Sequence, residues 1–214
     1  MYHGPGNGAD VNGIFAKLGQ GNTPWVLGYN EPDFDVGHGG VAASPQQAYD
    51  AWGNDLFRFS DRGARLVCPG VSSYDTDRSQ FTGGPSGLTW LRQFASIGGN
   101  RPEQFRCDAQ ALHWYGDASL GSGADQARLF IDYVSRAHGT VNDIFHRDMD
   151  LWITEFAPEP KENPDVMADF LQVAMPWLDA QPYVARYSPF KAEFMLDGNR
   201  NLNAAGNVFI FGHR

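Results

Sequence analysis

The chain has 214 residues, 42% of them hydrophobic, which is enough apolar material for one substantial core and little for a second. Its formal net charge of −9 and its pI near 5.0 argue against a nucleic-acid partner, because the 16 Lys and Arg residues are scattered along the chain. No run approaches the roughly 18 to 20 apolar residues of a membrane helix, and Met1 is not followed by a basic and then an apolar segment. We therefore expect residues 1–214 to form one soluble domain with no export signal, no nucleic-acid partner and no membrane partner.

Apolar runs of strand length alternate with segments of helical patterning along the chain. The expected strands are residues 25–30, 65–71, 109–116, 151–157 and 184–190. The expected helices are residues 44–60, 87–98, 124–139 and 163–180. The first helix starts with Ser44 as a cap and Pro45 in the first turn, and one face carries Ala48, Trp52, Leu56 and Phe59. This alternation predicts an α/β fold with a parallel sheet covered by helices.

The two cysteines, Cys68 and Cys107, are too few for a disulfide scaffold. Cys68 lies within one apolar run and Cys107 at the start of another, so we expect buried free thiols rather than a bridge. The redox compartment of the protein stays open on this evidence.

Two glutamates stand at the ends of expected strands. Glu31 ends the first strand and Glu155 the fourth, and in parallel α/β folds ligands bind at this carboxyl-terminal edge. Two carboxylates at one rim suit glycosidic bond cleavage, where one acid protonates the leaving oxygen and one carboxylate meets the oxocarbenium-like centre. Pro32 should keep Glu31 extended. The alternatives are a simple turn at Asn30-Glu31-Pro32 and a helix cap at Glu155.

Five ordered segments resemble a known enzyme family. They are "VLGYNEPD", "GLTWL", "LHWYG", "LWITEFA" and "YVARYSPF", and they resemble glycoside hydrolase family 128, a clan A catalytic-core family of β-1,3-glucanases, from about residue 24 to the C-terminus. The resemblance implies a (β/α)8 TIM-barrel fold and a retaining mechanism. It also implies that Glu31 is the acid/base and Glu155 the nucleophile.

Several neighbours are candidates for substrate binding. The Asn30 amide is placed to bind the sugar 2-hydroxyl, or else caps the strand end. His113 and Tyr115 share a strand face, and a Tyr115 hydroxyl beside Glu155 would keep that carboxylate ionised and oriented; alternatively both are core residues. Trp114 alternates to the other face and should pack beneath the helices.

Tyr187 and Phe190 lie where the family's last strand offers an aromatic platform for a sugar, and ordinary core packing is the alternative. We expect Asp33, Glu159, Glu162 and Glu193 to be rim or surface charges, with Asp33 and Glu193 within reach of sugar hydroxyls. The histidines and cysteines show no metal-binding spacing, and the glycine-rich stretches lack a phosphate-loop or dinucleotide pattern, so we expect no metal and no cofactor.

The chain departs from the family in its strand count. Five firm strands, with a possible short strand at residues 1–4 and a helical segment at residues 9–19, suggest a barrel that lacks the first two strands and part of the third. The interpretation is a single, N-terminally incomplete catalytic domain that hydrolyses β-1,3-glucan polysaccharide or oligosaccharide as a monomer. The resemblance suggests that it is secreted or associated with a cell wall. The alternatives are a non-catalytic carbohydrate-binding protein on a truncated barrel and another clan A glycosidase, such as a β-1,4-glucanase or mannanase.

Overall fold

The computed structural model describes residues 24–212. The strand expected at residues 1–4 and the helical segment expected at residues 9–19 lie outside the described residues. Contacts divide the chain into two compact units. Of the described residues, the first unit contains residues 24–112 and Gly139–Trp152, and the second contains His113–His138 and residues 153–212.

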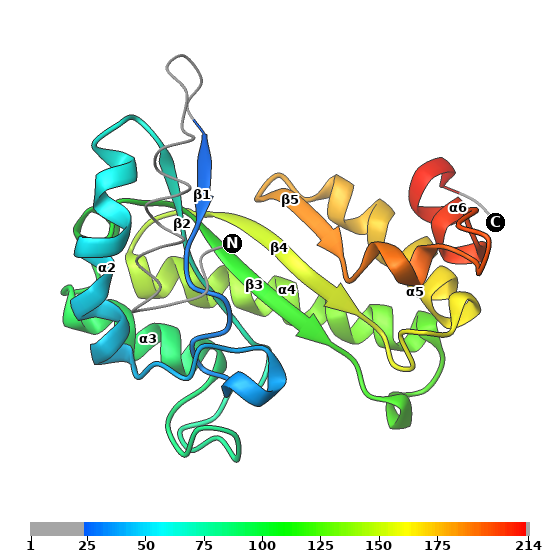
Figure 1. Cartoon of the computed structure of the whole chain (residues 1–214), viewed down its shortest axis with the longest axis horizontal. Helices are drawn as coiled ribbons and strands as arrows, with labels where there is room; N and C mark the ends of the chain where they lie inside the picture. Colours follow the sequence, from blue (N-terminus) through cyan, green and yellow to red (C-terminus); the bar gives the residue numbers. More distant parts are fainter. Residues whose placement is uncertain (1–23, 213–214) are drawn as a thin grey trace. The chain divides into compact units, whose positions relative to one another are not determined.

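Five strands alternate with helices along the described chain (Figure 1). The strands are β1 (Trp25–Leu27), β2 (Arg65–Val71), β3 (Cys107–Tyr115), β4 (Asp150–Ala157) and β5 (Val184–Pro189), and they are hydrogen-bonded in the order β1-β2-β3-β4-β5. The helices are α2 (Pro45–Ser60), α3 (Gly87–Ile97), α4 (Gly123–Phe145), α5 (Pro164–Ala180) and α6 (Ala204–Phe211). The pairs β1–β2 and β2–β3 are parallel. The predicted α/β class is confirmed, with one helix crossing over between each pair of successive strands.

Helix α2 shows why the chain folds this way locally. The Ser44 hydroxyl accepts a hydrogen bond from the backbone of Gln47, and the Gln47 side chain accepts one from the backbone of Ser44, which closes a capping box. Trp52 on the predicted apolar face is buried, and its indole N–H donates to the Phe105 carbonyl at 2.8 Å. The start and the buried face of this helix are therefore confirmed.

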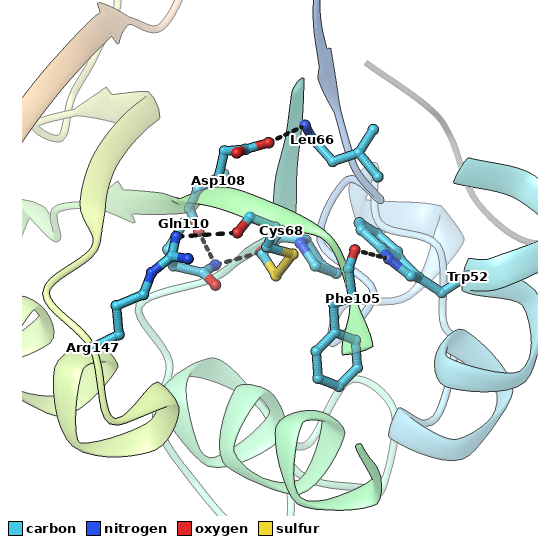
Figure 2. Close-up of a disulfide and its surroundings, with 10 residues drawn as sticks. Trp52, Leu66, Cys68, Phe105, Asp108, Gln110 and Arg147 are labelled. Carbon is cyan, nitrogen blue, oxygen red and sulfur yellow. Dashed lines mark hydrogen bonds between the residues drawn. A yellow bond between two sulfur atoms is a disulfide. The ribbon is translucent and has the colours of Figure 1, made fainter. Parts of the chain in front are cut away.

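Strand β2 places alternate residues on opposite faces of the sheet. Val67 joins Ala109, Ala111 and Trp152 in a buried cluster on one face. Cys68 points to the other face, which α2 and α3 cover (Figure 2). Because both faces are buried, the strand reads as an unbroken apolar run in the sequence.

The prediction of free thiols is wrong, because Cys68 and Cys107 form a disulfide with Cα atoms 5.4 Å apart. Strands β2 and β3 are parallel neighbours, and this pairing brings the two cysteines within the range that a disulfide spans. In Figure 2 the bridge lies among Trp52, Gln110 and Arg147, and Arg147 donates to the Cys107 carbonyl at 3.2 Å. The apolar runs around Cys68 and Cys107 carry no sequence feature that predicts their pairing with each other.

Aromatic rings fill the core of the second unit. Trp114 stacks on Phe170 with ring centroids 5.7 Å apart, and Phe130 stacks on Phe156 at 5.0 Å. Trp114 therefore packs beneath α4 and α5, as predicted. The last residues of β3 and β4 run in the same direction as β5 (Figure 1).

Helix α4 differs from the prediction, which ended it at Gly139. The helix continues to Phe145 because Val141, Ile144 and Phe145 extend its buried stripe. Gly139 is exposed, and its place inside the helix costs a moderate amount of free energy because glycine has a low helix propensity.

None of the helices in residues 24–212 is long and apolar enough to cross a membrane.

Candidate active site

Glu31 lies where the pairing of β1 and β2 ends. Its backbone N–H donates to the Gly70 carbonyl at 2.8 Å, and its carbonyl accepts from Phe34 at 3.0 Å and from Val41 at 3.0 Å. The chain therefore leaves the sheet and turns sharply at this residue. Glu31 is mostly buried, with 8% of its surface exposed.

The prediction that Pro32 keeps Glu31 extended is wrong. Glu31 has φ +39°, in the left-handed region that non-glycine residues rarely adopt. Glu31 is held by hydrogen bonds to Gly70 of β2 and to Phe34 and Val41 of the loop that follows it. Such strained residues cluster at functional sites, where the surrounding structure holds them in place.

Asn30 precedes Glu31 and is equally buried. Its amide Nδ2 donates to the Gly39 carbonyl at 3.1 Å, while its Oδ1 has no hydrogen-bond partner among the described residues. A buried amide oxygen without a partner costs free energy. Asn30 therefore offers an acceptor for a ligand hydroxyl.

Asp33 is not a surface charge, contrary to the prediction, because only 1% of its surface is exposed. Its Oδ2 accepts from the Ser72 hydroxyl at 2.6 Å and from the Gly87 backbone N–H at 2.8 Å. Burial raises the pKa of the Asp33 carboxyl, and the hydrogen bonds from Ser72 and Gly87 oppose that rise only in part. Asp33 thus ties the turn after Glu31 to the end of β2 and to the start of α3.

Glu155 lies in the second unit with its carboxylate between two side chains of β3. The Tyr115 hydroxyl donates to Glu155 Oε2 at 2.7 Å, and His113 Nδ1 lies 3.6 Å from the same oxygen. The Glu155 side chain is 20% exposed, so the carboxylate is accessible yet oriented by its neighbours. His113 is fully buried, and its Nε2 lies 2.9 Å from Thr154 Oγ1.

The two aromatic candidates, Tyr187 within β5 and Phe190 directly after it, lie in different surroundings. The Phe190 ring packs edge-on against Tyr115 with centroids 5.5 Å apart, so it adjoins the Glu155 environment. The Tyr187 hydroxyl instead donates to Asp179 of α5 at 2.7 Å. Burial, together with Asp179, raises the pKa of Tyr187 to about 12. Tyr187 therefore belongs to the contact between β5 and α5.

Lys161 is a candidate that the sequence pattern did not predict. Its ammonium lies 5.7 Å from the centroid of the Tyr115 ring, and it forms an ion pair with Glu159. Both residues belong to the loop that follows β4. The sequence feature that could have identified Glu159 and Lys161 as candidates is their position directly after the strand that carries Glu155.

The candidate residues fall into two groups. Asn30 and Glu31 belong to the first unit, and their environment is a strained turn at the end of β1. The second unit gathers His113, Tyr115 and Phe190 around Glu155. The first group holds a buried carboxylate on a strained turn, and the second holds a partly exposed carboxylate beside Tyr115 and His113.

The family of the chain follows from comparison with known proteins. The family model described as glycosyl hydrolase catalytic core matches residues 1–209, and the chain belongs to that family. The resemblance to glycoside hydrolase family 128 is confirmed by solved structures of that family. A search of curated proteins found no match.

These structures include several β-1,3-glucanases. One is a curdlan-specific exo-β-1,3-glucanase of subgroup III from Blastomyces gilchristii in complex with glucose, 25% identical with a TM-score of 0.75 over 99% of this chain and 80% of that one. Another is an endo-β-1,3-glucanase of subgroup II from Sorangium cellulosum, 25% identical with a TM-score of 0.76 over 99% and 78%. A subgroup VII oligosaccharide-binding protein from Trichoderma gamsii shares the fold at 15% identity, with a TM-score of 0.63 over 96% and 73%.

Proposed function

We propose that the chain is a retaining glycoside hydrolase that cleaves β-1,3-glucan, with Glu31 as acid/base and Glu155 as nucleophile. The hydrogen bond from the Tyr115 hydroxyl to Glu155 Oε2, at 2.7 Å, is the observation that carries this proposal. A donor at this distance stabilises the ionised form of a carboxylate and fixes the direction of its lone pairs. A nucleophile needs both properties. Membership of a glycosyl hydrolase family and the two glucanase structures at 25% identity support the substrate class.

In the proposed first step, Glu155 attacks the anomeric carbon while Glu31 donates its proton to the departing glycosidic oxygen. The bond between Glu155 and the sugar forms as the glycosidic bond breaks. In the second step Glu31 takes a proton from water, and that water displaces Glu155 from the sugar. The sugar keeps its β configuration after two displacements.

The surroundings of Glu31 support the acid/base role. Its left-handed backbone fixes the direction in which the carboxyl leaves the strand end. The unpartnered Oδ1 of the neighbouring Asn30 is the acceptor that we assign to the sugar 2-hydroxyl. We assign Phe190, which packs against Tyr115, as a stacking surface for the sugar ring. We assign His113, beside Glu155, as a further substrate-binding residue.

The proposal includes a fold and a location. We propose that residues 1–214 act as one catalytic domain of the (β/α)8 type, since the described residues have the strand–helix alternation of that fold. The Cys68–Cys107 disulfide supports secretion, because such bridges persist in oxidising surroundings.

The test is to incubate the protein with laminarin and with cello-oligosaccharides side by side, and to measure reducing ends and product sizes. Hydrolysis of laminarin with little or none of the β-1,4-linked chains is the expected result. Equal or faster cleavage of the β-1,4 chains would refute the linkage. The Glu155→Gln variant, which keeps the size of the side chain, is the control for a contaminating enzyme.

The second candidate is a carbohydrate-binding protein without activity. The observation in its favour is the shared fold of the oligosaccharide-binding protein from Trichoderma gamsii. Tight binding of laminari-oligosaccharides by the native chain, with no release of reducing ends, would establish this alternative.

A further inference from the structure

The loop after β4 carries an ion pair next to the Tyr115 ring. The ammonium of Lys161 pairs with the carboxylate of Glu159, and the two side chains are only 26% and 27% exposed. The same ammonium lies 5.7 Å from the centroid of the Tyr115 ring, within the range of a cation–π interaction. Tyr115 in turn holds Glu155, so charges in this loop lie one side chain away from the proposed nucleophile.

The position of this ion pair is fixed by a buried amide of α4. The Gln126 side chain is fully buried, its Nε2 donates to the Glu159 carbonyl at 2.6 Å, and its Oε1 accepts from the Glu159 backbone N–H at 2.9 Å. Gly116, directly after Tyr115, leaves space for this amide, since a Cβ there would lie 1.9 Å from Gln126 Oε1. Specific hydrogen bonds therefore hold this loop in place in the surroundings of Glu155.

We propose that Lys161 and Glu159 are positioning residues that adjust the charge state of Glu155 through Tyr115, with Lys161 favouring the ionised carboxylate and Glu159 limiting that effect. The inference rests on the proposed function in naming Glu155 as the nucleophile. It adds a pair of opposite charges that sets the pH range in which Glu155 is ionised.

A cation and an anion in the loop beside Tyr115 act on the ionisation of Glu155 in opposite directions. Removal of one partner of the ion pair leaves the charge of the other uncompensated. The titratable groups that face Glu155 within its unit are His113 and Tyr115 of β3, and these stay unchanged in the experiment. Lys161→Met should therefore make ionisation of Glu155 harder, and Glu159→Gln should make it easier.

The experiment is a pH titration of protein labelled with ¹³C at the glutamate carboxyl carbons, followed by NMR without substrate. The Glu155 signal is identified as the one lost in Glu155→Gln. All variants carry Glu31→Gln, so that the second proposed catalytic acid does not titrate. We expect the midpoint of the Glu155 signal to rise by about 0.5 pH unit in Lys161→Met and to fall by about as much in Glu159→Gln.

The controls separate charge from packing. Lys161→Arg should leave the midpoint near its native value, because it retains the cation. Arg128→Met removes a cation from an exposed ion pair with Asp125 on α4, and it should also leave the midpoint in place. Midpoints that do not move, or that move in the same direction in Lys161→Met and Glu159→Gln, would overturn the inference.

Activity then separates this inference from the proposed function. With Glu31 intact, the acidic limb of the kcat/KM profile on laminarin should move in the same two directions. Opposite NMR shifts in a protein that hydrolyses no β-glucan would support the charge pair and refute the hydrolase.

Discussion

Glu31 and Glu155 have different surroundings, and their proposed roles differ accordingly. Glu155 receives a hydroxyl donor from Tyr115, which favours an ionised nucleophile, whereas Glu31 sits on a strained turn with most of its surface buried. The two substitutions should therefore fail in different ways.

Glu155→Gln should abolish turnover of every substrate. Glu31→Gln should slow laminarin hydrolysis by about 10²- to 10⁴-fold, the usual contribution of a general acid, and act more mildly on formation of the glycosyl-enzyme from an activated aryl β-glucoside. That leaving group needs no proton. Steady-state rates and the pre-steady-state burst measure both effects. Equal losses on both substrates in Glu31→Gln would contradict the acid/base role.

Azide should restore part of the aryl-glucoside turnover of Glu31→Ala and give a β-glycosyl azide, because a small anion needs no general base. Rescue of Glu155→Ala should give the α-azide through a single displacement. The anomer in each product is measured by NMR. An inverted anomer in the first product of the native enzyme would contradict the retaining mechanism.

Asp33 gives a pH dependence of stability whose sign follows from its burial. Its pKa is raised above 3.8 in the folded chain, so the folded state holds this proton to higher pH than the unfolded state does. The free energy of unfolding therefore falls as pH rises from about 4 through the raised pKa, by about 1.4 kcal/mol for each pH unit between the two values, and stays lower above it.

Asp33→Asn carries no titrating proton, so the native-minus-variant difference in unfolding free energy should decline over that same pH window. Urea unfolding of both proteins between pH 3.5 and 8 measures it. A difference that is constant, or that grows with pH, would contradict the raised pKa.

The proposed catalytic pair could be predicted from local sequence, while the geometry around it could not. The order of the motifs was enough to single out Glu31 and Glu155, and side-chain alternation along one strand placed Tyr115. The backbone of Glu31 and the burial of Asp33 depend on partners such as Gly70 and Gly87, far away in sequence. No pattern within the "NEPD" segment encodes those distant hydrogen bonds.

At the scale of elements, α2 was predictable because its start depends on Ser44 and Pro45, which are adjacent in sequence. The end of α4 was not, because Gly139 resembles a terminating glycine until the apolar stripe beyond it is seen to be buried. The ends of α2, α3 and α5 lie within one residue of the predicted ends, so the miss is confined to α4.

Helix α4 offers a matched pair of glycine substitutions, one at its first residue and one in its interior. A Cβ at Gly123 would lie 2.1 Å from the Val166 carbonyl of α5, whereas a Cβ at Gly139 would meet nothing within 4 Å. Gly123→Ala should lower the free energy of unfolding by about 1 to 3 kcal/mol through overpacking. Gly139→Ala should raise it by about 0.5 to 1 kcal/mol through helix propensity. Urea unfolding of both variants measures this, and effects of the same sign would contradict the close approach of α4 and α5.

At the scale of the whole chain, the Cys68–Cys107 bridge restrains the unfolded state. It spans 39 residues of sequence, and closing a loop of that length corresponds to about 4 kcal/mol in the chain-entropy treatment. The double variant Cys68→Ala/Cys107→Ala should therefore unfold at markedly lower urea concentration. Both sulfurs are buried, so the native protein should resist dithiothreitol until it begins to unfold. An unchanged midpoint in the double variant would contradict a stabilising bridge.

The same bridge makes the exposed segment between β2 and α3 a place where the backbone can be cut without losing a piece of the protein. Arg78 in that segment is exposed, and it lies between the two linked cysteines. After limited trypsin digestion at Arg78, the polypeptides on either side of the cut remain one covalent molecule through their sulfurs. Such a preparation should migrate as a single species on a non-reducing gel and separate into two fragments once reductant is added.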